Sequence, residues 1–156
     1  MIKVIFVCYG NICRSVSAEF IFKNIVKKHN LENKFDIISR GISSCEEGHD
    51  IYYPSKIMLD KNNIPYTKHY AKKIDDEDII TADYILCMEL SHIQAIKEEF
   101  SFTIYQNKLH LLGEYLIEKV NIEDPYYYKN FQKVYDLIYS SCNNFLDYLI
   151  KNNLVK

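Results

Sequence analysis

The feature that most constrains the fold is an unbroken apolar run at residues 4–7 that leads directly into the stretch CYGNICRS at residues 8–15. A short continuous apolar run is typical of a strand covered on both faces, as in a parallel sheet. In such sheets ligands bind beyond the carboxyl ends of the strands. The run therefore predicts an α/β fold whose functional site lies at the first strand-to-helix turn.

The stretch after the first strand is suited to holding an anion. Its backbone N–H groups can curve around one centre if Gly10 and Asn11 adopt unusual φ and ψ angles, as both residue types can. A helix that begins near Ser15 adds unpaired N–H groups and a positive dipole end, and the guanidinium of Arg14 matches two phosphate oxygens. The predicted phosphate-binding loop comprises Tyr9, Gly10, Asn11, Ile12, Cys13, Arg14 and Ser15.

Cys8 stands at the start of this loop. A positive environment favours the thiolate over the thiol, and the thiolate is the nucleophilic form. The sequence therefore predicts an anion site with a nucleophile in its floor, suited to attack on phosphorus. The alternative is an inert buried cysteine at a strand end, which would leave the Gly, Asn, Arg and Ser that follow unexplained.

The rest of the chain alternates strands and helices. Apolar residues recur at helical spacing after Ser17, and at residues 131–149 they form the strongest periodic pattern in the chain. The alternation predicts a single domain over residues 1–156, with a mostly parallel, four-stranded twisted sheet between helical layers. The predicted strands are 3–7, 35–39, 83–88 and 108–112; the predicted helices are 15–29, 54–62, 75–80, one capped by Ser91, and 131–149.

Composition excludes several classes of function. The net charge is −2 with no block of like charges, so we expect neither nucleic acid nor a membrane surface as partner. No stretch approaches the ~20 apolar residues of a membrane-spanning helix, and the N-terminal apolar run is too short for a signal peptide. Five cysteines without paired spacing predict reduced thiols in the cytoplasm, with no metal and no cofactor. We expect a monomer.

A thiolate that attacks a phosphate ester needs an acid to protonate the leaving oxygen. Asp124 is the candidate, because Pro125 restrains it to extended conformations and so makes a stiff support for its carboxyl group. Tyr126 and Tyr127 would form an aromatic wall that packs against a ring on the substrate. The alternative is that Asp124 only caps the final helix.

The residues at 8–15, with Ala18-Glu19 and the late sequence DPYY at 124–127, resemble the low-molecular-weight protein tyrosine phosphatase family. The resemblance implies metal-free hydrolysis of phosphotyrosine proteins or small aryl phosphates, with inhibition by phosphate, vanadate and sulfate-like anions. It makes Cys8 the nucleophile of a phosphocysteine intermediate, Arg14 the phosphate ligand and Asp124 the general acid and base. It also implies a supporting network of Asn11, Ser15, Ser39 and His69, and a substrate rim that includes Ile12, Tyr126 and Tyr127.

Some positions leave alternatives open. In the family the second loop cysteine, here Cys13, can form a reversible disulfide with the nucleophile; a packing role is the alternative. Cys45 stands where an aromatic residue is often found, so the grip on a substrate ring is either weaker or supplied by Tyr52 or Tyr53. Tyr52 replaces a frequent aspartate and Tyr128 a frequent glycine, so the rim specificity is open. Relatives that act on phosphoarginine have threonine at the position of Ile12 and lack the double tyrosine. A relative that reduces arsenate would need two more cysteines near Cys87, and the sequence has none there. A module that binds phosphotyrosine without turnover would lack the nucleophile or the acid, and candidates for both are present.

Overall fold

The computed structural model of the chain describes residues 1–100 and 107–155. The four strands run parallel in the order β2-β1-β3-β4, so the predicted sheet is parallel throughout. The strands are β1 (Ile2–Cys8), β2 (Phe35–Gly41), β3 (Tyr84–Cys87) and β4 (Leu109–Leu111). The helices are α1 (Arg14–Lys28), α2 (Tyr53–Lys61), α3 (Asp76–Thr81), α4 (Leu90–Glu99), α5 (Pro125–Tyr128) and α6 (Phe131–Lys151), with 3₁₀ turns η1 (Glu32–Lys34) and η3 (Leu112–Tyr115).

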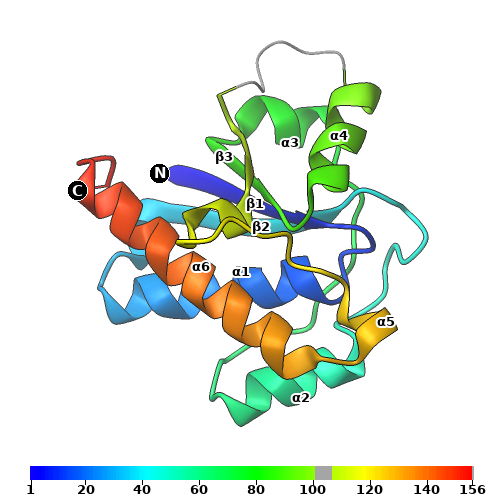
Figure 1. Cartoon of the computed structure of the whole chain (residues 1–156). Coiled ribbons are helices and arrows are strands. Elements are labelled where there is room, and N and C mark those ends of the chain that lie inside the picture. The colour runs from blue at the N-terminus through cyan, green and yellow to red at the C-terminus, as the bar shows by residue number, and fades with distance from the viewer. Residues whose placement is uncertain (101–106, 156) are drawn as a thin grey trace.

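The helices form a layer on each face of the sheet, with α1, α2 and α6 on one side and α3 and α4 on the other (Figure 1). Successive side chains of a strand point to opposite faces, and β1 feeds both layers. Val4 and Phe6 pack in the core with α1 and α6, whereas Ile5 and Val7 pack with α3 and α4. This two-sided burial explains why the first strand is apolar without interruption.

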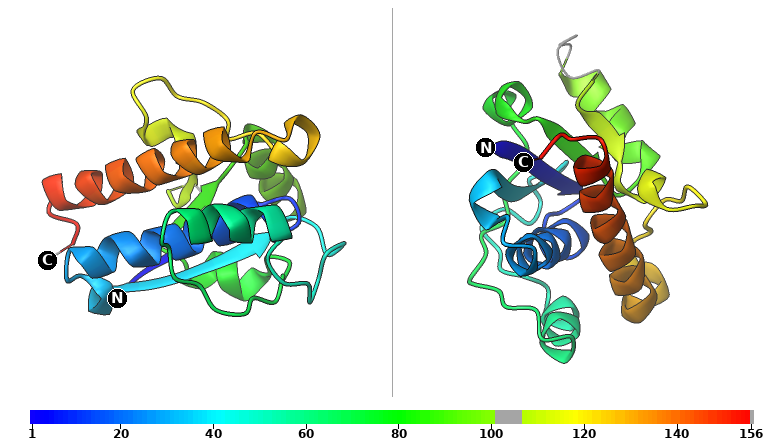
Figure 2. Two further views of the ribbon diagram at one scale, coloured as in Figure 1. Left: turned by 90° about the horizontal axis from the view of Figure 1, so that it is seen from below. Right: turned by 90° about the vertical axis from the view of Figure 1, so that its left-hand side faces the viewer.

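The long amphipathic helix α6 lies alongside α1, as both views in Figure 2 show. Its apolar stripe, which includes Ile138, Phe145 and Leu149, is buried against the α1 side of the sheet. The periodic pattern at residues 131–149 therefore identified a real packing face, and the helix runs two residues further.

Each predicted element is present, and its ends differ from the prediction by at most two residues. The prediction that Ser91 caps α4 is wrong: Glu89 is the N-cap residue, and Ser91 is already inside the helix. The backbone N–H of Glu89 donates a hydrogen bond to Nδ1 of His92 (3.2 Å), so the histidine side chain completes this helix start. The short helix α5 and the two 3₁₀ turns were not predicted.

The strand order places the functional edge of the sheet. The chain passes from β1 to β2 on one side and then returns to β3 on the other side of β1, so a crevice opens at the carboxyl ends of these strands. Cys8 pairs with Gly41, and Val7 pairs with Cys87, so the ends of all three strands lie together. The residues that follow β1 and β3 can therefore contribute to one site.

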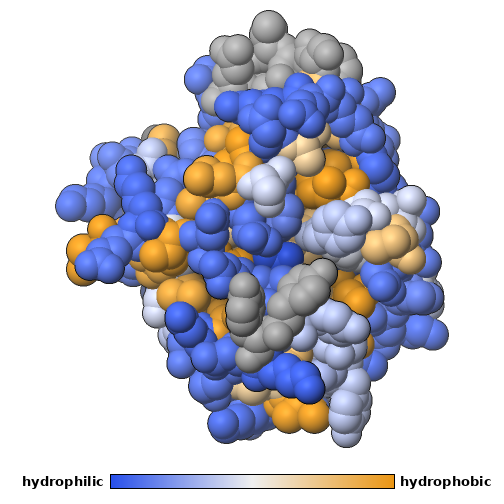
Figure 3. Space-filling model, turned by 45° about the vertical axis from the view of Figure 1, so that its right-hand side comes forward, coloured by the Kyte–Doolittle hydropathy of each residue, from blue (hydrophilic) through white to orange (hydrophobic). Residues whose placement is uncertain are grey.

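On the face drawn in Figure 3, hydrophobic residues occur in separate patches between hydrophilic ones. Such scattering is ordinary for a protein surface. Within residues 1–100 and 107–155, no helix combines the length and the apolar character needed to cross a bilayer.

Candidate active site

The loop between β1 and α1 is held by its carbonyl groups. Four of them accept hydrogen bonds from backbone N–H groups outside the loop: Cys8 from Ile42, Tyr9 from Ser43, Ile12 from Tyr52 and Cys13 from Ser17. Within the described part of the chain, the N–H groups of residues 9–14 donate to no protein acceptor. The loop thus keeps its donors for an anion, as at other phosphate-binding turns before a helix.

Asn11 fixes the shape of the loop. Its φ angle is 62°, in the left-handed region that asparagine tolerates better than most residues. Its side chain donates to the hydroxyl of Ser15 (2.8 Å) and accepts from the backbone N–H of Lys72 (2.9 Å). Its carbonyl accepts a hydrogen bond from Nε2 of His69 (2.6 Å). The structure therefore brings together three of the four predicted network residues.

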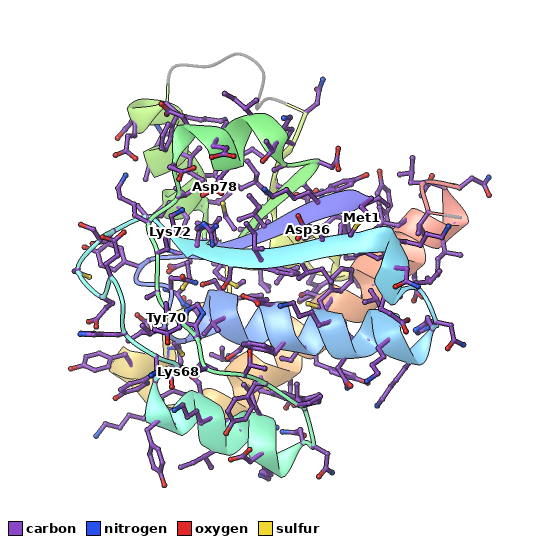
Figure 4. All side chains as sticks on the ribbon, turned by 180° about the vertical axis from the view of Figure 1, so that it is seen from behind. Met1, Asp36, Lys68, Tyr70, Lys72 and Asp78 are labelled. Atoms are coloured by element: carbon purple, nitrogen blue, oxygen red, sulfur yellow. The ribbon has the colours of Figure 1, made fainter. Side chains whose placement is uncertain are left out.

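His69 and Lys72 belong to the extended segment that runs past the outside of α1 to the end of β2, where Tyr70 and Lys72 are labelled in Figure 4. The backbone of Lys72 accepts a hydrogen bond from the N–H of Gly41 (2.8 Å), which fastens the segment to the sheet edge. The loop is thus supported from behind by a segment almost 60 residues further along the chain, as the 58-residue separation of His69 and Asn11 shows.

Ser39, the fourth predicted network residue, has a different hydrogen-bond partner. Its hydroxyl donates to Oε1 of Glu19 on α1 (2.7 Å), and the other oxygen of Glu19 pairs with Lys23 (2.6 Å). Ser39 and Glu19 are both buried. This pair links β2 to α1.

The two glycines beside the loop allow close approach rather than unusual backbone angles. Unusual angles were predicted at both Gly10 and Asn11; Asn11 has a positive φ, and Gly10 does not. A Cβ on Gly10 would lie 3.1 Å from Cγ of Glu46, and one on Gly41 would lie 2.9 Å from the carbonyl oxygen of Tyr9. Any side chain at position 41 would push the loop away from β2.

Cys8 lies at the floor of the loop, and only 2% of its surface is exposed. Its Sγ is 3.0 Å from Oγ of Ser15. Because the Ser15 oxygen already accepts a hydrogen bond from Asn11, its own proton can be directed to the sulfur. This arrangement stabilises negative charge on Sγ.

Arg14 is held in place by two groups that the sequence analysis did not identify. Its Nη1 donates to Oε2 of Glu89 (2.5 Å) and to the carbonyl oxygen of Ile122 (2.8 Å). Burial by itself would lower the pKa of Arg14, but the charge of Cys8 and the hydrogen bond to Glu89 outweigh it and raise that pKa. The guanidinium is therefore a positive charge fixed in place through Nη1.

Asp124 lies across the site from Cys8, at the start of α5. Its Oδ1 accepts a hydrogen bond from the backbone N–H of Tyr126 (2.9 Å), and its Oδ2 is 3.7 Å from Nη2 of Arg14. Asp124 is the N-cap residue of the short helix α5 and not of the final helix, because Asn130 caps α6 by accepting from the N–H of Lys133 (3.2 Å). The capping alternative is therefore right about the kind of contact and wrong about the helix.

These three side chains open into one cavity of about 520 Å³. Cys8 and Arg14 line its floor, and Asp124 lies in its wall. The predicted rim residues Ile12 and Tyr126 line it as well; the side chain of Tyr127 lies outside the described part of the structure. The other lining residues are Tyr9, Gly10, Cys13, Cys45, Glu46, His49, Asp50, Ile51, Tyr52 and Tyr53.

Comparison with known proteins identifies this architecture. Residues 3–155 match the family described as low molecular weight phosphotyrosine protein phosphatase. The chain belongs to this family. It is 36% identical over 157 residues to the low molecular weight protein-tyrosine-phosphatase PtpA of Staphylococcus aureus, with 100% of this chain and 99% of that protein covered.

Solved structures agree with this phosphatase fold. The crystal structure of YfkJ from Bacillus subtilis superposes with a TM-score of 0.92 at 31% identity, covering 97% of this chain and 96% of that one. DARP, a Drosophila arginine phosphatase, superposes with a TM-score of 0.86 at 32% identity, covering 94% and 97%.

Cys13 of the phosphatase lines the same cavity as Cys8 and also contacts α2. Its Sγ accepts a hydrogen bond from the hydroxyl of Ser55 on α2 (3.1 Å). Burial raises the pKa of Cys13 to about 12, although the hydrogen bond from Ser55 acts in the opposite direction. Cys13 is therefore a protonated thiol at neutral pH, and it is not bonded to Cys8 in this structure.

A structural metal site in a protein needs several suitable side chains close together. In residues 1–100 and 107–155, no three His, Cys, Asp or Glu side chains are grouped closely enough to hold an ion.

Proposed function

We propose that this phosphatase hydrolyses phosphotyrosine through a phosphocysteine intermediate, with Cys8 as nucleophile, Arg14 as phosphate ligand and Asp124 as general acid and base. The observation that carries the proposal is that these side chains, contributed by β1, α1 and the segment before α5, line one cavity. Both the 3.0 Å contact of Sγ with Ser15 and the 3.7 Å separation of Arg14 from Asp124 support these roles.

In the first step the Cys8 thiolate attacks phosphorus, while the N–H groups of residues 9–14 and the guanidinium of Arg14 bind the phosphoryl oxygens. The bond between phosphorus and the tyrosine oxygen breaks, and its electron pair stays on that oxygen. The protonated carboxyl group of Asp124 gives its proton to this oxygen, so tyrosine leaves as a neutral phenol.

In the second step Asp124, now a carboxylate, takes a proton from water as the water oxygen attacks phosphorus. The S–P bond breaks, and its electron pair returns to Cys8 as a thiolate. The hydroxyl of Ser15 stabilises this charge through the hydrogen bond described above. Inorganic phosphate leaves, and Cys8 and Asp124 regain their initial protonation states.

The substrate class follows from the walls of the cavity. Ile12 beside the loop and the ring of Tyr126, with that of Tyr52 packed against it at a centroid distance of 6.2 Å, provide apolar and aromatic surface for a phenol ring. Phosphotyrosine in a protein, or a small aryl phosphate, fits this surface. Inorganic phosphate, vanadate and sulfate-like anions should compete for the same loop.

Hydrolysis of phosphoarginine is the second candidate, favoured by the likeness to the Drosophila arginine phosphatase. Two features argue against it. Relatives that act on phosphoarginine carry threonine at the position of Ile12, and they lack the pair of tyrosines that follows Pro125 here.

The proposal is tested by comparing hydrolysis of phosphotyrosine and phosphoarginine by the purified protein in the presence of a chelator. We expect phosphotyrosine to be the better substrate by kcat/KM, and Cys8→Ser to abolish turnover of both. Substantial residual activity of Cys8→Ser would remove the nucleophile assignment. A preference for phosphoarginine would replace the substrate class and leave the cysteine chemistry intact.

The role of Asp124 requires its own measurement. General acid catalysis matters most for leaving groups that are poor without a proton. Asp124→Ala should therefore slow phenyl phosphate much more than p-nitrophenyl phosphate, and it should remove one limb of the pH–rate profile. Equal losses on both esters would contradict the acid assignment.

A further inference from the structure

Three aromatic rings pack together where the phosphate-binding loop, α5 and α6 meet. The ring of Tyr52 lies 6.2 Å from that of Tyr126 and 6.1 Å from that of Phe131, measured between centroids. The interplanar angles are 54° and 36°, which are tilted rather than stacked arrangements. Tyr52 is the central member, because it contacts both of the other rings. Tyr52 is half-buried, and it lines the active-site cavity.

The backbone of Tyr52 is fastened to the phosphate-binding loop. Its N–H donates to the carbonyl oxygen of Ile12 (2.7 Å), and its own carbonyl accepts from the N–H groups of Ser55 (2.9 Å) and Lys56 (3.2 Å) at the start of α2. Tyr52 is thus fixed relative to the loop that holds the phosphate. Its ring extends from this fixed point to the opposite wall of the cavity.

The opposite wall carries the acid. Tyr126 is two residues after Asp124, and its backbone N–H donates to Oδ1 of that carboxyl group (2.9 Å). This hydrogen bond leaves Oδ2 on the side of Arg14, at 3.7 Å from Nη2. The position of Tyr126 therefore sets which carboxyl oxygen faces the phosphate. A displacement of Tyr126 would turn Oδ2 away from the leaving group.

We propose that Tyr52 is a positioning residue for Asp124, because its ring holds Tyr126 at a fixed place relative to the phosphate-binding loop. This inference deepens the proposed function and rests on it. The hydrogen bond of Tyr52 to the loop is made by its backbone, so we expect its ring to act through Tyr126 and the acid and not on phosphate binding. A side-chain substitution at position 52 leaves that backbone contact available.

The experiment measures kcat/KM for a series of aryl phosphates whose phenols differ in acidity. Tyr52→Ala should lower kcat/KM for the least acidic phenols by roughly ten-fold, in line with the loss of two aromatic contacts, and change it little for the most acidic. Tyr52→Phe keeps the ring and should follow the wild type. Tyr52→Leu keeps apolar volume without the ring, and it replaces Tyr52→Ala if that variant does not fold.

Tyr53→Ala is the matched control. Tyr53 is the next residue and lines the same cavity, but its side chain is largely exposed, with 71% of its surface accessible. Its variant should keep the wild-type dependence on phenol acidity. The inhibition constant for vanadate should stay within about twofold of the wild type in Tyr52→Ala, because the phosphate-binding loop is unaltered.

The double variant Tyr52→Ala/Asp124→Ala decides whether the ring acts through the acid. We expect it to depend on phenol acidity no more steeply than Asp124→Ala alone. The inference is overturned if Tyr52→Ala keeps the wild-type dependence while Asp124→Ala does not, or if the two effects add in the double variant. If Asp124→Ala itself keeps the wild-type dependence, the acid assignment of the proposed function fails and the inference fails with it.

Discussion

Substitution of Asn11 tests whether the loop depends on a left-handed residue. At most positions glycine is less favourable than alanine, because it loses more conformational freedom on folding. Asn11 has a φ of 62°, where a Cβ without a compensating polar group costs roughly 1–2 kcal/mol. We therefore expect the usual order to reverse here, with Asn11→Gly more stable than Asn11→Ala.

The magnitude follows from the contacts of the side chain. Both variants lose the hydrogen bonds to Ser15 and Lys72, at about 1 kcal/mol each. Asn11→Ala adds the left-handed strain, whereas Asn11→Gly adds roughly 0.4–1 kcal/mol of chain entropy in the unfolded state. The free energy of unfolding of Asn11→Ala should therefore be about 1 kcal/mol lower than that of Asn11→Gly.

The assay is urea denaturation of the wild type and both variants, followed by far-UV circular dichroism and by tyrosine fluorescence to check that unfolding is two-state. Equal slopes of free energy against urea would allow the midpoints to be compared directly. If Asn11→Ala proves as stable as Asn11→Gly, or more so, the backbone at residue 11 does not constrain the loop and the reasoning is refuted.

Two further predictions concern other buried groups. Ser15→Ala removes the hydroxyl 3.0 Å from Sγ of Cys8, and a hydrogen bond to a charged group is worth about 1.5–3 kcal/mol, so kcat should fall roughly 10- to 100-fold. Stopped-flow traces should then show a burst of phenol, since breakdown of phosphocysteine becomes slow; loss of activity without a burst would contradict this. Burial, with the charge of Arg14, lowers the pKa of His92 from 6.5 to about 3. Between these values the unfolded chain binds a proton that the folded chain does not, so stability is lost as the pH falls from 6.5 towards 3. His92→Asn keeps an acceptor for the N–H of Glu89 and should lose less stability than the wild type between pH 7 and pH 4.5; identical losses would count against the assignment.

The elements that could be predicted are those whose signal is local. The apolar run at 4–7, the helical period after Ser17 and the stripe of α6 each follow from which faces a strand or helix buries. Asn11 likewise acts locally, because its side chain donates to Ser15 four residues further on, within the same loop.

The errors arose where two local solutions compete. Ser91 is a good capping residue, but the helix begins two residues earlier than a Ser91 cap would place it, because Glu89 is extended and His92 accepts its N–H. Unusual angles were expected at both Gly10 and Asn11, but of these two residues Asn11 alone has a positive φ, and the missing Cβ of Gly10 makes room for Glu46. In each case residue type allowed both arrangements, and packing against another segment selected one.

The sequence by itself determined the layered fold and the order of the residues in the loop between β1 and α1, which we propose binds phosphate. Only the tertiary structure decided what surrounds them: Glu89 and Ile122 on Arg14, Lys72 and His69 on Asn11, and Tyr52 against Tyr126. The partners of Asn11 and Arg14 lie between 58 and 108 residues away from them in the sequence. Strand pairing brings them to one edge of the sheet, and no local pattern in the chain encodes that pairing.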